Sequence, residues 1–435
     1  MIPKSYDLGE NARLRTCATD RFKAGMLSVS FLIPVDTETV CLAPLLLSVL
    51  RRGTEKYPTL SEINRRLDYL WGTVFSIRSF FRGNCLVVGF MADLLDPVYL
   101  PSGGEEIMDG VLELMEQILF HPVLDEDGLL SERYVESEKL LQCDAIRAAK
   151  NNPKAYAAER CKALLLEGEA GGIPLYGTEE QTMAVTRERL TSFWRDLLRD
   201  LRPDCFYVGC EDAETVLKKL ENVFGGRISA AGKPLPNPCG MIREGRGICK
   251  TESMPVAQSQ LMMVYRCGVQ FKHPDHAACV VLNELLGNSP ISRLFVYVRE
   301  KQSLCYSCVS SYSAYYGTFL ISCGLKSESR EAAEQEIKRQ IECLACGDFR
   351  AEELEAAKKS LLNTYRQIED SPSGLESYYF GRALVGDPKS LEECRADFEK
   401  VTADDVARIA RTLTPDVTYF LEGTLVGDGE DEDED

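Results

Sequence analysis

Histidine is scarce in this chain of 435 residues, which contains only His121, His273 and His276. None of the three stands in the H-x-x-E-H pattern by which a helix binds zinc. The only close pair is His273 and His276, and Pro274 between them is typical of the first turn of a helix. A structural or surface role is therefore favoured for this pair over metal binding, and we expect no metal on this chain.

Long apolar runs and common cofactor motifs are also missing. No stretch of about 18 apolar residues could cross a membrane, and residues 1–15 lack the apolar core of a signal peptide. We therefore expect a cytoplasmic protein that does not bind membranes. The sequence has no G-x-S-x-G elbow, phosphate-binding loop or dinucleotide fingerprint, so we expect no cofactor.

Basic side chains are too few to balance the acidic ones, and the net charge is −18 at pH 7. Such an excess argues against nucleic acid as a partner and is compatible with neutral or cationic peptides. Seven acidic residues of the excess lie between Asp428 and Asp435. We predict that residues 428–435 form an acidic, disordered tail.

Cysteine, in contrast, is abundant, with 17 residues. In a reducing compartment these side chains behave as small buried hydrophobes, and disulfides are not expected. Two C-x-x-C pairs, Cys305/Cys308 and Cys343/Cys346, raise the possibility of a four-thiolate zinc site. The first pair is expected within a strand, where a separation of three residues sends side chains to opposite faces. The second is expected on a helix, so a zinc site is disfavoured.

The order of elements indicates an internal duplication. An apolar strand over 27–35 precedes a helix over 43–52, and the same order recurs with a strand over 260–265 and a helix over 277–286. Near the end of each half, the related segments VTRERL and VTADDV begin at Val185 and Val401, each followed by a helix, a Pro-Asp turn and a strand.

Local signals refine this organisation. Thr186 has the position of a helix N-cap, and a two-stranded hairpin is expected to turn at Gly83 and Asn84. A segment rich in glycine and proline, residues 225–247, is the natural linker. We therefore predict two α+β domains, over residues 1–228 and 250–427.

The stretch from Pro290 to Ser307, PISRLFVYVREKQSLCYS, predicts a buried helix face, a turn and a strand that begins near Leu304. Arg299 and Tyr306 flank that junction, where a guanidinium and a phenol could bind one acceptor-rich ligand such as a peptide backbone. Spacing alone favours a simpler alternative, in which Arg299 pairs with a nearby glutamate and Tyr306 caps a core strand.

This stretch resembles the C-terminal signature SRLF-x3-REK-x2-L-x-YS of the pitrilysin/insulinase-type zinc peptidases. The run RRGTEKYPTLSEINRRLDYLWGT, together with YAAER at Tyr156 and GTEE at Gly177, is more narrowly similar to the YmfF-like, catalytically inactive branch. The resemblance implies an α+β fold of two homologous halves, each a mostly antiparallel sheet with helices packed on one face, as in mitochondrial processing peptidase and insulinase. It also implies that Arg299 and Tyr306 bind substrate carbonyls.

Active members of that family carry H-x-x-E-H on their first helix, with a third zinc ligand on a later helix. Alignment through Gly53 places the three motif positions at Pro44, Leu47 and Ser48, and the third ligand falls near Ala145 within a residue or two. These residues offer no zinc site. Glu138 matches a supporting glutamate of the family and is expected to be an exposed helix charge.

Two functions follow from the resemblance. In the first, the chain is the non-catalytic, substrate-binding subunit of a two-subunit zinc-dependent peptidase acting on peptides, with an H-x-x-E-H relative as its partner. In the second, it is an inactive peptide-binding or scaffold protein, a homodimer with no peptidase partner. The intact arginine and tyrosine favour the first, and a neighbouring gene for an H-x-x-E-H relative would discriminate between them.

Overall fold

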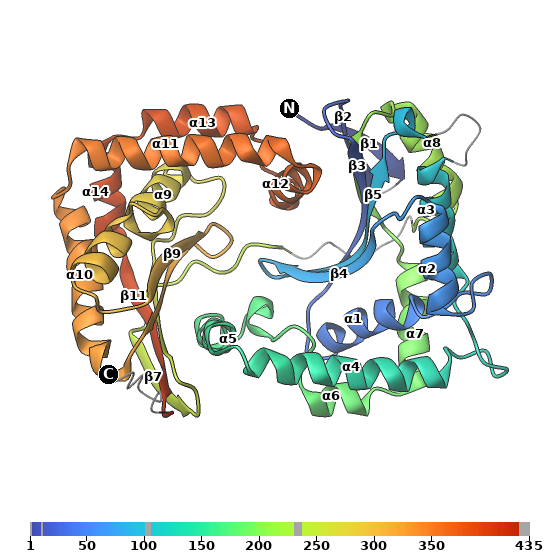
Figure 1. The fold of residues 1–435 in the computed structure, drawn as a ribbon, viewed down its shortest axis with the longest axis horizontal. Coiled ribbons are helices and arrows are strands. Elements are labelled where there is room, and N and C mark those ends of the chain that lie inside the picture. Colours follow the sequence, from blue (N-terminus) through green and yellow to red (C-terminus); the bar gives the residue numbers. More distant parts are fainter. Residues whose placement is uncertain (1, 10–11, 101–105, 230–236, 426–435) are drawn as a thin grey trace, which may run out of the picture. The chain divides into compact units, whose positions relative to one another are not determined.

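The computed structural model describes residues 2–9, 12–100, 106–229 and 237–425 (Figure 1). The chain forms two compact units that both draw on the two halves of the sequence. Unit 1 comprises Met1–Arg147, Ile173–Pro238 and Arg366–Ser390, and unit 2 comprises Ala148–Gly172, Cys239–Tyr365 and Leu391–Asp435. The predicted tail at 428–435 lies outside the described residues.

Unit 1 contains a six-stranded sheet in the order β1-β2-β6-β3-β5-β4. Its strands are β1 (Lys4–Gly9), β2 (Ala12–Ala18), β3 (Ala24–Ile33), β4 (Phe75–Arg82), β5 (Cys85–Leu95) and β6 (Asp204–Gly209). The β2/β6 pair is parallel, and the pairs β1/β2, β3/β5, β3/β6 and β4/β5 are antiparallel. The β4/β5 hairpin turns at Gly83 and Asn84 as predicted, and Gly83 has a φ of 57°, which suits glycine.

The helices of unit 1 other than α12 lie mainly on the apolar face of this sheet. Alternation along β3 directs Leu27, Val29 and Phe31 into a core shared with α1 and α3. Thr186 caps α7 as predicted, and its hydroxyl accepts a hydrogen bond from the Arg189 N–H at 3.2 Å. The elements are α1 (Thr39–Leu50), α2 (Leu60–Tyr69), η1 (Pro97–Tyr99), α3 (Ile107–Phe120), α4 (Glu132–Lys150), α6 (Glu179–Ala184), α7 (Arg187–Arg199), α8 (Ala213–Phe224), η6 (Ile368–Asp370) and α12 (Pro372–Leu384).

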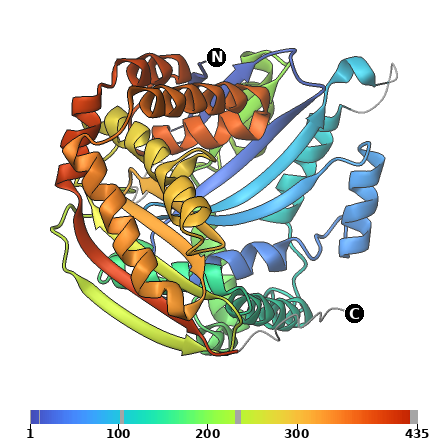
Figure 2. The same cartoon turned by 60° about the vertical axis from the view of Figure 1, so that its left-hand side comes forward.

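Unit 2 contains a five-stranded sheet in the order β7-β11-β8-β10-β9. Its strands are β7 (Ile248–Met254), β8 (Ser259–Arg266), β9 (Ser307–Ser313), β10 (Thr318–Leu325) and β11 (Thr414–Gly423). The β7/β11 pair, side by side in Figure 2, is parallel, and β8/β11, β8/β10 and β9/β10 are antiparallel. Both sheets are therefore mostly antiparallel, which confirms the predicted fold class.

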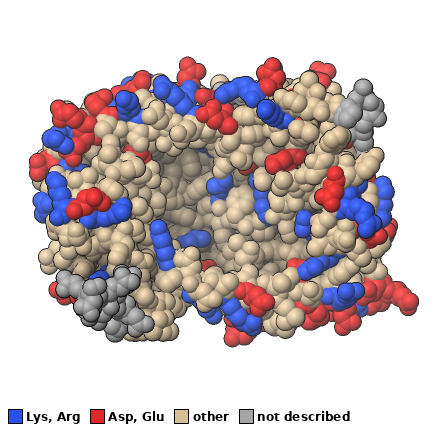
Figure 3. Space-filling model, in the orientation of Figure 1, with Lys and Arg blue, Asp and Glu red and all other residues tan. Residues whose placement is uncertain are grey.

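The helices α9, α10 and α14 of unit 2 pack together on one side of its sheet (Figure 1). Acidic and basic side chains are interspersed over α11 and α13 at the upper left of Figure 3, so this area carries no patch of a single sign. The elements of unit 2 are α5 (Pro153–Leu165), η2 (Ala170–Gly172), α9 (His276–Asn283), η3 (Glu284–Asn288), η4 (Leu294–Lys301), η5 (Ser327–Ser329), α10 (Arg330–Cys346), α11 (Ala351–Gln367), α13 (Leu391–Lys400) and α14 (Ala403–Thr412). In the part of the chain that the structure describes, no helix combines the length and the apolar character needed to cross a bilayer.

Each unit also receives one helix from the other half of the sequence. In unit 2, α5 packs on β8 and β11 through Cys161 and Leu165, which share a core with Met262 and Tyr419. In unit 1, α12 packs on β3 and β6, and its Glu376 accepts hydrogen bonds from Ser28 and Arg78. The sequence analysis predicts helices on one face of each sheet, and most helices follow this prediction. The exchanged helices α5 and α12 pack on the opposite face of their sheets.

Candidate functional site

The segment around Arg299 begins as the predicted buried helix. The helix η4 has the wide π-type winding, and it buries Leu294 and Val298. It ends at Lys301, and Ser303 just beyond it has a φ of 51°, while the N–H of Leu304 donates to the Val298 carbonyl at 3.1 Å. Because this N–H closes the helix, it is not available to a sheet, and β9 begins at Ser307 rather than near Leu304. A π-type turn is often found at functional sites.

Arg299 and Tyr306 line one hollow of about 610 Å³ within unit 2. Both side chains reach solvent, since Arg299 is 43% exposed and Tyr306 is 55% exposed. The volume lies in the range of ligand pockets, roughly 300–1,000 Å³. The remaining lining residues are Glu300, Ser303, Leu304, Cys305, Lys326 and Ser329. The structure therefore places the two residues that the sequence singled out at the same concave surface.

The surroundings of Arg299 and Tyr306 leave their polar groups directed to solvent. The Arg299 Nε lies 3.5 Å from a carboxylate oxygen of its neighbour Glu300, an exposed pair of little energetic value. The guanidinium also lies 4.8 Å from the centre of the Phe295 ring, a cation–π contact that orients it. Among the described residues, the Tyr306 hydroxyl has no hydrogen-bond partner. The arrangement can donate hydrogen bonds to an acceptor-rich ligand.

Cys305, in the same hollow, does not follow the sequence prediction. It precedes β9, which begins at Ser307, so strand alternation does not set its direction relative to Cys308. The expectation that Cys305 and Cys308 lie within one strand is therefore wrong. The C-x-x-C spacing in the sequence drew attention to these two cysteines. The sequence did not show that β9 begins only at Ser307, after Cys305.

The positions aligned with the zinc ligands lie on α1 and α4 of unit 1. Pro44 and Leu47 are buried in α1, Ser48 is half-buried, and Ala145 is exposed on α4. Three of the four side chains have no donor atom for a metal. Over the described ranges, no group of three or more His, Cys, Asp or Glu side chains could hold a metal ion.

Hydrogen bonds that the sequence did not reveal join these two helices. Gln142 of α4 donates to the Cys41 carbonyl at 3.3 Å and to the Thr182 hydroxyl at 3.1 Å. Glu138 pairs with Arg52 and is buried, so the expectation of an exposed helix charge at Glu138 is wrong. Its carboxylate tolerates burial because the arginine beside it compensates the lost hydration.

The two neighbouring histidines of unit 2 contact ordinary structural partners. The N–H of Asp275 donates to the His273 Nδ1 at 3.1 Å. His276 begins α9, and its Nδ1 lies 3.4 Å from the Tyr312 hydroxyl. These contacts place the pair at the start of a helix, where the sequence analysis expects it.

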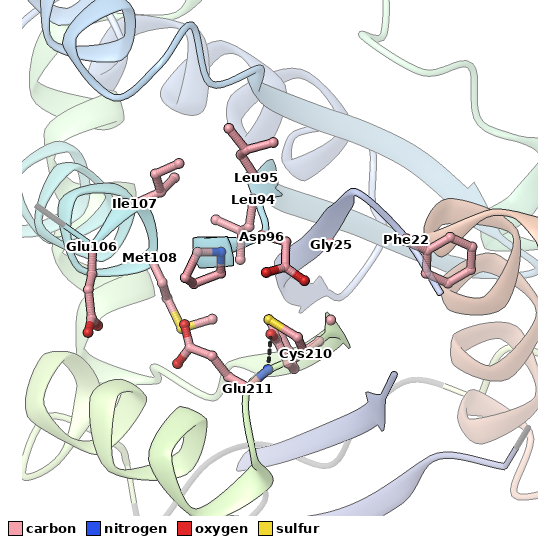
Figure 4. Close-up of a pocket in the computed structure, with 13 residues that line it drawn as sticks. Phe22, Gly25, Leu94, Leu95, Asp96, Glu106, Ile107, Met108, Cys210 and Glu211 are labelled. Atoms are coloured by element: carbon pink, nitrogen blue, oxygen red, sulfur yellow. Dashed lines mark hydrogen bonds between the residues drawn. The ribbon is translucent and has the colours of Figure 1, made fainter. Parts of the chain in front are cut away.

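A second hollow, in unit 1, is too small for a substrate. Its volume is about 20 Å³, enough for about one water molecule. Asp96 and Cys210 lie beside each other at its centre (Figure 4). Burial, together with the hydrogen bond to Asp96, raises the pKa of the Cys210 thiol to about 11, so the thiol is protonated at neutral pH. This hollow offers no candidate active site.

The fold is that of M16-like peptidases, and the positions that the resemblance aligns with zinc ligands include Pro44, Leu47 and Ala145, whose side chains have no donor atom for a metal. Residues 184–361 match the family described as Peptidase M16 inactive domain. The chain is 26% identical over 406 residues to a protein of Bacillus subtilis named "Probable inactive metalloprotease YmfF", with 93% of this chain and 94% of that protein covered. It is 24% identical over 314 residues to the "Uncharacterized zinc protease YmxG" of the same organism, which covers 71% of this chain and 73% of YmxG.

Solved structures support the fold. A conserved protein from Enterococcus faecalis superposes with a TM-score of 0.88 at 22% identity, covering 98% of this chain and 100% of that one. A structure from Pseudomonas fluorescens, described as a peptidase M16 inactive domain, has a TM-score of 0.78 at 16% identity with the same coverage. These likenesses extend over the two units of this chain.

Proposed function

We propose that this chain is the non-catalytic, substrate-binding subunit of a two-subunit zinc-dependent peptidase that acts on peptides. The observation that carries this proposal is the contrast between two sites on one chain. Arg299 and Tyr306 line a hollow of about 610 Å³, whereas the aligned metal positions include Pro44 and Leu47, which lack donor atoms. A partner of the same family supplies H-x-x-E-H and the zinc ion, in the bacterial cytoplasm.

The donor chemistry of the hollow suits a peptide backbone. A peptide carbonyl is a strong hydrogen-bond acceptor that repeats along the chain. Arginine stays charged at every relevant pH and presents its N–H donors in a fixed plane, and tyrosine adds a hydroxyl on a rigid ring. Donors aimed at a carbonyl that gains negative charge during hydrolysis lower the barrier as well as bind substrate.

Co-purification tests the proposal. The chain should co-purify from its host with a relative that carries H-x-x-E-H, and the complex should cleave unstructured peptides in a chelator-sensitive manner. The isolated chain should bind the same peptides without cleaving them. A homodimer that never associates with such a relative, with no peptidase activity in the fraction, would instead establish the scaffold alternative.

A further inference from the structure

Cys305 lines the hollow that contains Arg299, and two further cysteines lie in the strands β9 and β10 of the same sheet. Cys305 is partly exposed. Cys308 and Cys323 face each other across β9 and β10, and both are buried, with exposed fractions of 2% and 0%. Cys305 stands three positions before Cys308, in the turn that leads into β9. Of these three cysteines, Cys305 is therefore the one that solvent reaches.

Charges and hydrogen bonds around Cys305 favour its thiolate. Hydrogen bonds from Cys308 and Cys323, against the opposing effect of burial and helped by the charge of Arg299, lower the pKa of Cys305 to about 4. The pKa values of Cys308 and Cys323 are raised, chiefly because each is a hydrogen-bond partner of Cys305, so both remain thiols that can donate. The other ionisable groups that line the hollow are Glu300, Tyr306 and Lys326.

We propose that Cys305 is a thiol-oxidation site, which reacts with small disulfides such as oxidised glutathione and is resolved by Cys308. This inference does not rest on peptide binding. It rests on a partly exposed cysteine in a hollow that Arg299 and Lys326 also line, with a second cysteine three positions along the chain. Reactive cysteines are recognised by such electropositive, partly exposed surroundings.

Cys308 is the better resolving thiol because of its place in the sheet. A disulfide requires two Cα atoms within about 4.4–6.8 Å, so the cysteine in the more adjustable segment pairs more readily. Cys323 lies in β10, which is paired on both sides, by β8 and by β9. Cys308 lies at the start of β9, an edge strand, and only two residues separate it from Cys305 in the turn before that strand.

The reaction balances in two exchange steps. The Cys305 thiolate attacks one sulfur of oxidised glutathione, a mixed disulfide forms, and one glutathione thiolate leaves. Cys308 then loses its proton to water and attacks the Cys305 sulfur, which releases the second glutathione. Two protein thiols are oxidised to one disulfide, and one glutathione disulfide is reduced to two thiols.

The first measurement compares Cys305 with the exposed Cys346 in the full-length, reduced chain. Alkylation by iodoacetamide, quantified residue by residue with mass spectrometry, should be nearly independent of pH between 5 and 7 at Cys305. The alkylation rate at Cys346, measured in the same samples, is the reference for an exposed cysteine outside the hollow. Equal pH dependence at the two residues would overturn the proposal.

The second measurement identifies the resolving thiol. With oxidised glutathione, the unmodified chain should form a Cys305–Cys308 disulfide, whereas Cys308→Ser should accumulate a glutathione adduct at Cys305. The matched control Cys323→Ser should behave like the unmodified chain. A disulfide between Cys305 and Cys323, or adducts confined to exposed cysteines such as Cys346, would exclude the proposed pairing.

Discussion

Asp416 and Arg266 form an ion pair that is buried on both sides. The Arg266 Nε donates to the Asp416 Oδ2 at 2.5 Å, and the two side chains are 3% and 0% exposed. Arg246 donates to the other carboxylate oxygen at 2.9 Å. The same two arginines also donate to the carbonyls of Leu164 and Leu165 at the end of α5, at 2.7 Å and 3.1 Å. This cluster therefore holds the exchanged helix α5 on the sheet of unit 2.

We expect Asp416→Asn to lower the free energy of unfolding by about 3–5 kcal/mol, because the change leaves the buried Arg266 charge without its partner. Urea unfolding followed by circular dichroism measures this loss. The control Glu334→Gln removes the exposed ion pair with Lys338 and should cost less than about 1 kcal/mol. Similar losses in the two variants would show that the Asp416 cluster contributes no more than a surface pair.

Asp416 should also make the protein sensitive to acid. Burial by itself raises the pKa of this carboxyl, but hydrogen bonds from Arg246 and Arg266 outweigh it and hold the pKa below its usual 3.8. A lowered folded-state pKa gives stability that is present above the unfolded-state value and is lost as pH falls through the folded value. The unfolding free energy of the unmodified chain should therefore decline below about pH 4 more steeply than that of Asp416→Asn, in urea titrations at each pH. Parallel declines would contradict this.

Changes at the hollow should affect catalysis by the assembled peptidase without affecting assembly. We expect Arg299→Ala and Tyr306→Phe each to lower kcat/KM by roughly 5- to 150-fold, which corresponds to about 1–3 kcal/mol for a hydrogen bond to substrate. Lys301→Ala is the matched control, since Lys301 is exposed in the same helix but is not among the residues that line the hollow. If both variants retain full activity while folding and association persist, the two residues have a structural role only.

The isolated chain should hold no stoichiometric zinc and should cleave no peptide. A zinc site needs at least three good ligands, and Pro44, Leu47 and Ala145 supply none. Plasma emission spectroscopy of the purified chain, beside an H-x-x-E-H relative prepared in the same buffer, measures the metal content. One tightly bound zinc ion per chain together with chelator-sensitive cleavage would refute the prediction.

The sequence was informative where local chemistry determines structure. The Gly83-Asn84 turn and the Thr186 cap were predictable because each depends on a few neighbouring residues. Helix α1 was expected over 43–52 but runs from Thr39 to Leu50. Asp36 explains the earlier start, because its carboxylate accepts hydrogen bonds from the Glu38 and Thr39 N–H groups.

Long-range contacts were less predictable. Glu138 looked like a surface charge because its partner, Arg52, lies 86 positions away in the sequence. The π-type winding of η4 departs from the 3.6-residue period on which helix predictions depend, so it moved the start of β9 to Ser307 and changed the position of Cys305. The residues Arg299 and Tyr306 were identified by family resemblance, since their spacing alone favoured a structural role.

The exchange of α5 and α12 has a consequence for how the gene can be divided. An expression fragment that stops at the linker carries the strands of unit 1 but not α12, and the complementary fragment carries the strands of unit 2 but not α5. The first fragment would expose the part of its sheet around Ser28, which α12 covers. The second fragment would expose the Asp416 cluster, which α5 covers. The two halves of the coding sequence are therefore complementary parts, and the two fragments should fold cooperatively only when they are co-expressed.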